Sequence, residues 1–126
     1  MEHTALLIAA LLIIVIGLVH SWLGEVRLIG PLLDVQKRRG ILAKSAFARQ
    51  TLRFAWHLTT IAWWGFGAVL ASYAFSALDN SATYVLGSIA VTFFVTGIVT
   101  LVVSRGRHLA WPVFMAIAGL SVWPIL

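Results

Sequence analysis

The chain has 126 residues, of which 61% are hydrophobic and 10% are charged, and its formal net charge is +5. This composition is too apolar for a soluble domain, which must cover its core with polar surface. The sequence contains no cysteine, which excludes disulfides and thiolate metal sites. Together these features predict an integral membrane protein.

Four stretches without Asp, Glu, Lys or Arg are each about as long as a membrane span, which takes roughly 20 apolar residues. In chain order they cover residues 4–24, 54–78, 80–104 and 108–126. Their apolar runs are continuous rather than alternating in polarity, which favours helices over the strands of a membrane barrel. We therefore predict a single all-α membrane domain over residues 1–126, an antiparallel bundle of four transmembrane helices with a basic cytoplasmic loop at 25–53.

The basic residues lie on one side of the predicted spans, in the first and third connections. They are Arg27, Lys37, Arg38, Arg39, Lys44, Arg49, Arg53, Arg105 and Arg107. Because basic loops face the cytoplasm, both termini are predicted on the non-cytoplasmic side. We expect a bacterial inner membrane, with an organellar membrane as the alternative. All these residues except Arg27 are expected to face anionic lipid headgroups, and no nucleic-acid partner is expected.

Within the basic loop, Gly30-Pro31 predicts a helix break, with the neighbouring apolar residues lying along the membrane interface. Farther along, the spacing from about Ala43 permits a helix that continues into the second span. On that helix Arg53 and His57 are four residues apart, so they share a face. His57 would then lie about 6 Å deeper than Arg53, at about 1.5 Å per residue. An ionisable side chain within a membrane span is a candidate for function.

Three histidines are predicted at the cytoplasmic ends of their spans, namely His20, His57 and His108, with Glu25 in the same layer. These four residues have the donor chemistry for a divalent transition metal, and the same histidines are candidate cofactor-binding residues for a haem held between helices. The alternative is structural, with each histidine bonded to a backbone group or carboxylate. No buried Asp or Glu is expected beside a serine to form a nucleophile triad, so the sequence favours a protein that is not an enzyme.

Small and hydroxyl-bearing residues recur at four-residue intervals, a spacing that lets membrane helices approach closely. The predicted helix-packing positions are Gly17, Ser21, Gly67, Ala71, Ser88, Thr92, Thr96 and Thr100. The last four belong to a row of hydroxyls along the third span. That row is interpreted either as side chains bonded to their own helix, with small packing surfaces, or as a polar path or cofactor lining.

Three hypotheses for function follow. The first is a non-enzymatic accessory or assembly subunit of a membrane complex, bound to other membrane protein subunits. The alternative is a redox bundle that binds haem or metal through the cytoplasmic histidines. The third is transport of protons or small solutes, which is disfavoured because no acidic residue lies within a span.

Overall fold

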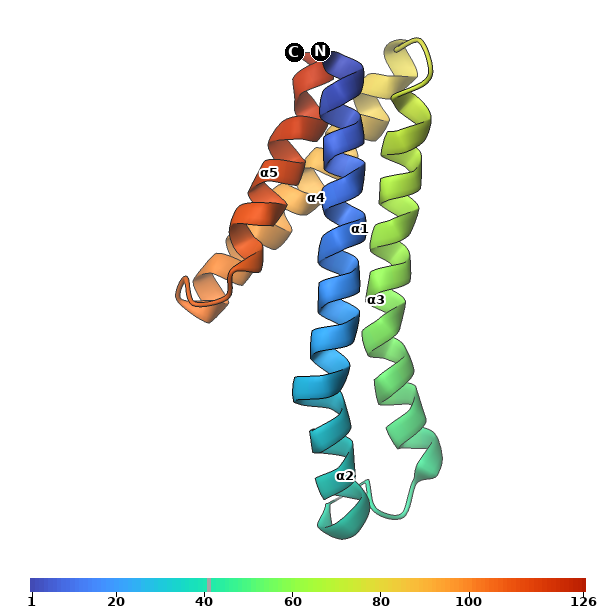
Figure 1. The fold of residues 1–126 in the computed structure, drawn as a ribbon, viewed down its shortest axis with the longest axis vertical. Helices are drawn as coiled ribbons and strands as arrows, with labels where there is room; N and C mark the ends of the chain where they lie inside the picture. The colour runs from blue at the N-terminus through green and yellow to red at the C-terminus, as the bar shows by residue number, and fades with distance from the viewer. Residues whose placement is uncertain (41) are drawn as a thin grey trace. The chain divides into compact units, whose positions relative to one another are not determined.

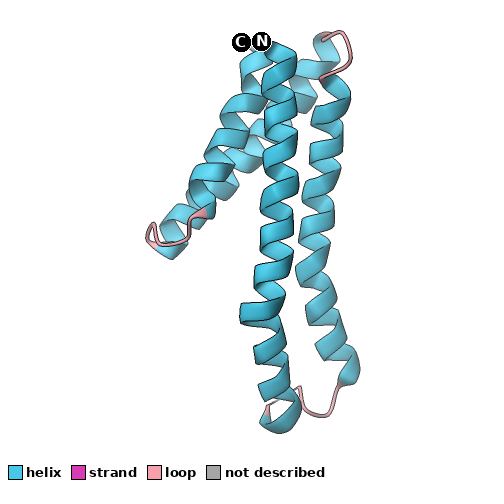
Figure 2. Ribbon diagram, in the orientation of Figure 1, coloured by secondary structure: helices cyan, strands magenta, loops and turns pink. Residues whose placement is uncertain are grey.

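The structure is a computed structural model that describes residues 1–40 and 42–126, without the side chains of Arg38 and Arg39. The described residues form helices and turns and no strand, which confirms the all-helical prediction (Figure 2). Figure 1 shows the elements in chain order. They are α1 (Glu2–Gly24), the π-helical turn η1 (Glu25–Ile29), α2 (Gly30–Arg39), α3 (Ala46–Tyr73), α4 (Asn80–Ser104), α5 (Ala110–Val122) and the 3-10 turn η2 (Trp123–Ile125).

Two helical segments of the described chain are long and apolar enough to cross a membrane. They are the continuous segment Glu2–Lys37, which includes α1 and η1, and α4. The segment Ala110–Ile125 is apolar but shorter. Helix α3 has 28 residues, and its apolar run is interrupted near its middle by His57 and two threonines.

The predicted break at Gly30-Pro31 is wrong, because the helix continues through both residues. The π-helical turn η1 changes the hydrogen-bond register, so that the Gly30 N–H donates to the Glu25 carbonyl five residues earlier. Pro31 then falls in the first turn of α2, where its missing N–H costs little. A Cβ on Gly30 would lie 2.8 Å from the Glu25 carbonyl oxygen, so the wide turn requires glycine.

Contacts divide the chain into two units, one of Met1–Ile16 with Trp64–Leu126 and the other of Gly17–Trp63. In the first unit, α4 and α5 pack as an antiparallel pair (Figure 1). Gly97 of α4 lies against the Met115 side chain of α5, where an added Cβ would be 3.2 Å from the Met115 methyl group. The missing side chain of Gly97 therefore lets the two helices approach closely.

An aromatic cluster connects three helices of the first unit. The Phe93 ring of α4 lies 6.0 Å from Phe66 of α3 and 6.0 Å from Phe114 of α5, measured between ring centroids. Phe93 is only 1% exposed. In the same unit α1 contacts α3 through the Trp64 indole, whose N–H donates to the Ile14 carbonyl at 3.4 Å.

Helix α4 has a defined cap at each end. At its N-terminus the Asp79 carboxylate accepts hydrogen bonds from the backbone N–H groups of Ser81 and Ala82, at 3.1 and 3.0 Å. The Ser81 hydroxyl, 2.6 Å away, and the Ala82 N–H lower the pKa of Asp79, because both stabilise the ionised carboxylate. At the C-terminus Arg105 and Gly106 adopt left-handed conformations, with φ of 52° and 77°. These two residues end the helix in the manner of a C-cap.

Candidate functional site

The second unit contains a polar network that connects the α1–η1 segment with α3. The Ser21 hydroxyl lies 2.6 Å from Nδ1 of His57, and Nε2 of His57 lies 3.3 Å from Oε2 of Glu25. One tautomer satisfies both contacts, since Nε2–H then donates to the carboxylate and Nδ1 accepts from the hydroxyl. Both ring nitrogens of His57 are therefore occupied by protein groups.

Glu25 connects His57 and Arg53 in this network. Its other carboxylate oxygen, Oε1, lies 2.9 Å from Nη2 of Arg53, which is half exposed. The carboxylate is one-third exposed, so solvent weakens the ion pair, and such pairs stabilise by about 1 kcal/mol or less. The Glu25 carboxylate therefore contacts both Arg53 and His57.

His20 lies in an aromatic setting rather than in this network. Its ring stacks on Trp56, with centroids 4.4 Å apart and planes 8° from parallel, and it also contacts Trp63 at 4.9 Å. The Trp56 indole N–H donates to the His20 carbonyl at 3.3 Å. Gly24 provides the space for this indole, because a Cβ on Gly24 would lie 2.2 Å from its nitrogen.

His108 belongs to the first unit, in the turn before α5. It is exposed, and its Nδ1 accepts a hydrogen bond from the Ala110 N–H at 3.3 Å, which caps that helix. Within the described part of the chain, no group of three or more His, Cys, Asp or Glu is arranged to hold a metal ion. The metal or haem site of His20, His57, His108 and Glu25 stays a prediction.

The network has the hydroxyl, imidazole and carboxylate groups of a nucleophile triad, a combination that was not expected from the sequence. One feature of the sequence could have predicted this network. Ser21 and Glu25 are four residues apart, so they share a helix face, and they lie at the predicted level of His57. Triad chemistry also needs donors for the developing oxyanion. Ser21 lies inside α1, where backbone N–H groups are used in helix bonds. The geometry therefore favours a structural clamp between helices.

Two of the predicted helix-packing residues, Gly17 and Gly67, lie buried at contacts between α1 and α3. Gly17 is buried in the second unit, where its carbonyl accepts from the buried Thr60 hydroxyl at 3.4 Å. Gly67 is buried in the first unit, where a Cβ would lie 3.3 Å from Ile13. Ser21 and Ala71 are half-buried.

The hydroxyl row of α4 bonds to its own helix. Ser88, Thr92 and Thr96 donate to the carbonyls four residues earlier at 2.7 to 2.8 Å. Ser88 and Thr92 are exposed, whereas Thr96 and Thr100 are half-buried. Hydrogen bonds from these side chains to their own helix are the local structure expected under the first interpretation of the row. The packing role of the row stays a prediction.

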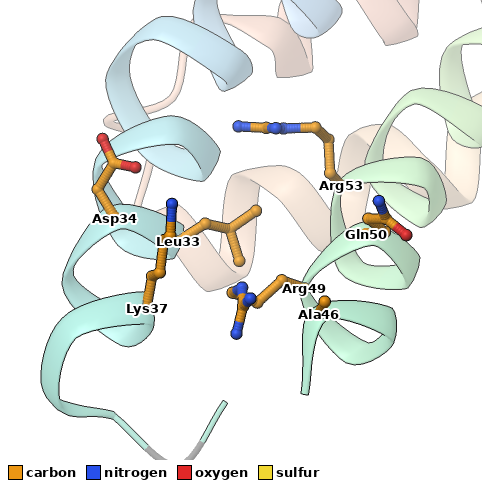
Figure 3. Close-up of a pocket in the computed structure, with 7 residues that line it drawn as sticks. All are labelled: Leu33, Asp34, Lys37, Ala46, Arg49, Gln50 and Arg53. Atoms are coloured by element: carbon orange, nitrogen blue, oxygen red, sulfur yellow. The ribbon is translucent and has the colours of Figure 1, made fainter. Parts of the chain in front are cut away.

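Among the residues expected to face lipid headgroups, Lys37, Arg49 and Arg53 line a cavity of about 220 Å³ between α2 and α3 (Figure 3). Lys44 is exposed in the turn before α3, and Arg105 and Arg107 are exposed in the turn after α4. The side chains of Arg38 and Arg39 lie outside the described residues.

Comparisons with models of known protein families, with curated protein sequences and with solved structures find no match for this chain.

Proposed function

We propose that this chain is a four-span membrane protein that acts as an accessory or assembly subunit of a membrane complex, with both termini on the non-cytoplasmic side. The membrane is a bacterial inner membrane in this proposal. The segments with basic residues, 25–53 and 105–107, face the cytoplasm, as expected from the preference of Lys and Arg for that side.

The observation that carries the proposal is the apolar outer surface of helices whose buried faces contain many small residues. On α1, Ala5 and Ala9 are buried, whereas Leu11 is 62% exposed. On α4, Ala90 is buried, whereas Val91 is 63% exposed. A surface helix of a soluble protein would present polar residues outward. Small residues between helices and large apolar residues outside are the arrangement that suits lipid.

Two features support a role in assembly rather than in the chemistry of a site. The polar side chains of His57, Ser21 and Thr60 are used in bonds within the second unit. In the first unit, Gly65 of α3 and Gly119 of α5 are exposed, and a Cβ at either position would meet nothing within 4 Å. These positions leave room for the close approach of a helix from another subunit.

Reporter fusions test the topology. A reporter that is active only outside the cytoplasm should work at Leu126 and fail when inserted in the loop near Lys44. A cytoplasmic reporter should show the opposite pattern. If one reporter is active both at Leu126 and near Lys44, the four-span arrangement is refuted.

Purification in a mild detergent tests the subunit role. The protein should copurify with a defined membrane partner, and Gly65→Leu or Gly119→Leu should reduce recovery of that partner without reducing the amount of folded chain. Val99→Leu, on the exposed side of α4, serves as the control. A monomer that copurifies with no partner, or one that contains haem or stoichiometric metal, would contradict the proposal.

A further inference from the structure

The cavity between α2 and α3 lies wholly in the second unit. Leu33, Asp34 and Lys37 line it from α2, and Ala46, Arg49, Gln50 and Arg53 line it from α3. Its volume of about 220 Å³ equals that of roughly seven water molecules at about 30 Å³ each. That space accommodates a phosphate group and the atoms attached to it.

Positive charge predominates around this cavity. The lining contains three basic residues, Lys37, Arg49 and Arg53, and a single carboxylate, that of Asp34, which points away from the two arginines (Figure 3). The Arg53 charge is shared with Glu25, but Lys37 makes no ion pair with any other residue that the structure describes. An excess of positive charge in a partly enclosed space concentrates anions there.

Both arginines already contact protein groups before any ligand arrives. Nη1 of Arg49 donates to the carbonyls of Leu42 and Ala43, at 2.5 and 3.0 Å, and Nη2 of Arg53 contacts Glu25. Each guanidinium keeps further N–H groups for a ligand, because it has five in total. Fixed guanidinium groups bind the oxygens of phosphate in pairs, and little conformational freedom remains to be lost on binding.

We propose that this cavity binds one phosphate group, contributed by the headgroup of an anionic lipid or by free phosphate. Arg49, Arg53 and Lys37 contact its oxygens from two helices. Leu33 is buried and forms an apolar wall of the site. Binding of the phosphate group does not depend on the proposed function, whereas a lipid source rests on the proposed membrane orientation.

Binding is measured on the full-length protein in a neutral detergent, by titration with short-chain phosphatidic acid followed by thermal stability and native mass spectrometry. Diacylglycerol with the same chains is the probe that lacks phosphate. Inorganic phosphate is added as a competitor. We expect saturable binding of one phosphatidic acid and no binding of diacylglycerol. Competition by inorganic phosphate would show that the phosphate group alone is recognised, and binding without competition would assign the site to a lipid headgroup.

Matched variants separate a defined site from diffuse attraction to the basic loop. Lys37→Gln should weaken phosphatidic acid binding about fivefold. Arg27→Gln removes one charge from the same segment outside the cavity and should change binding less than about twofold. Asp34→Asn should strengthen binding, a gain that misfolding does not produce.

Equal weakening by Lys37→Gln and Arg27→Gln, unsaturable binding, or equal binding of diacylglycerol would overturn the proposal. Unchanged or weaker binding by Asp34→Asn would also count against it. The reporter fusions test the membrane arrangement separately, so either proposal can fail while the other holds.

Discussion

The contact between Gly24 and Trp56 gives the sharpest test of the second unit. In Gly24→Ala the new Cβ would lie 2.2 to 2.5 Å from three atoms of the indole ring, closer than non-bonded carbon atoms approach. The ring must therefore move away from α1. That movement breaks its stack with His20 and its hydrogen bond to the His20 carbonyl.

The expected loss follows from these two contacts. An aromatic stack contributes about 0.5–1.5 kcal/mol, and a hydrogen bond of this kind contributes about 0.5–1.5 kcal/mol. The combined loss is about 1–3 kcal/mol. Alanine also favours a helix by about 1 kcal/mol over glycine, so Gly65→Ala, which meets nothing within 4 Å, is the matched control. The difference between the two variants cancels helix propensity and should be about 1–3 kcal/mol.

The free energy of unfolding is measured by titrating the detergent-solubilised protein with a denaturing detergent and following helix content by circular dichroism. The same pair of variants is then made in a Trp56→Leu background, where Gly24→Ala should lose most of its cost. If Gly24→Ala is as stable as Gly65→Ala, or if its cost persists without the indole, the proposed contact is wrong.

Three further predictions concern the first unit. Phe93→Ala should lower the free energy of unfolding by about 3 kcal/mol, whereas Phe94→Ala, at a 53% exposed site, should change it by less than about 0.5 kcal/mol; equal losses would contradict the buried cluster. The lowered pKa of Asp79 stabilises the fold above the ordinary carboxyl pKa of about 3.9, and this contribution is lost as pH falls through the folded pKa. Asp79→Asn keeps a cap acceptor without the charge, so the wild-type advantage in denaturant titrations should shrink as pH falls below the ordinary carboxyl pKa of about 3.9. A constant advantage would refute the assignment. Thr96→Val should change stability by less than about 0.5 kcal/mol, because its hydroxyl donates to the Thr92 carbonyl of its own helix. Loss of proton flux in liposomes carrying this variant would instead favour transport.

Apolar length was sufficient to predict α1, α3, α4 and α5, but not all of their limits, and it did not predict α2. Helix α3 ends at Tyr73, although the apolar stretch continues to Leu78. The residues between form the turn that positions Asp79 to cap α4. At Gly30-Pro31 the sequence predicted a break, because the rule for proline assumes α-helical register. The π-helical turn changes that register, and no periodic pattern of apolar residues reports it.

The side-chain contacts of the candidate residues could not be predicted from the sequence. His20 and His57 were placed at one level, and both lie in the second unit. Depth along a helix follows from residue number, whereas the partner of a side chain depends on the rotation and packing of that helix. His20 stacks on Trp56, while His57 contacts Ser21 and Glu25. Residue number alone therefore does not identify the partner of a side chain, and a ligand shared by these residues stays a prediction.

Arg53 connects the polar network with the phosphate cavity, because it contacts Glu25 and also lines the cavity. An unpaired Arg53 would be free to extend toward solvent or lipid headgroups, as long basic side chains do. The bond to Glu25 holds its guanidinium beside the helices, and the bonds of Arg49 to the turn before α3 do the same on the next turn of that helix. Glu25 thus offsets part of the positive charge of Arg53 but restricts the position of its guanidinium. For a ligand with several oxygens, fixed donors contribute specificity that an equal charge on mobile lysines does not.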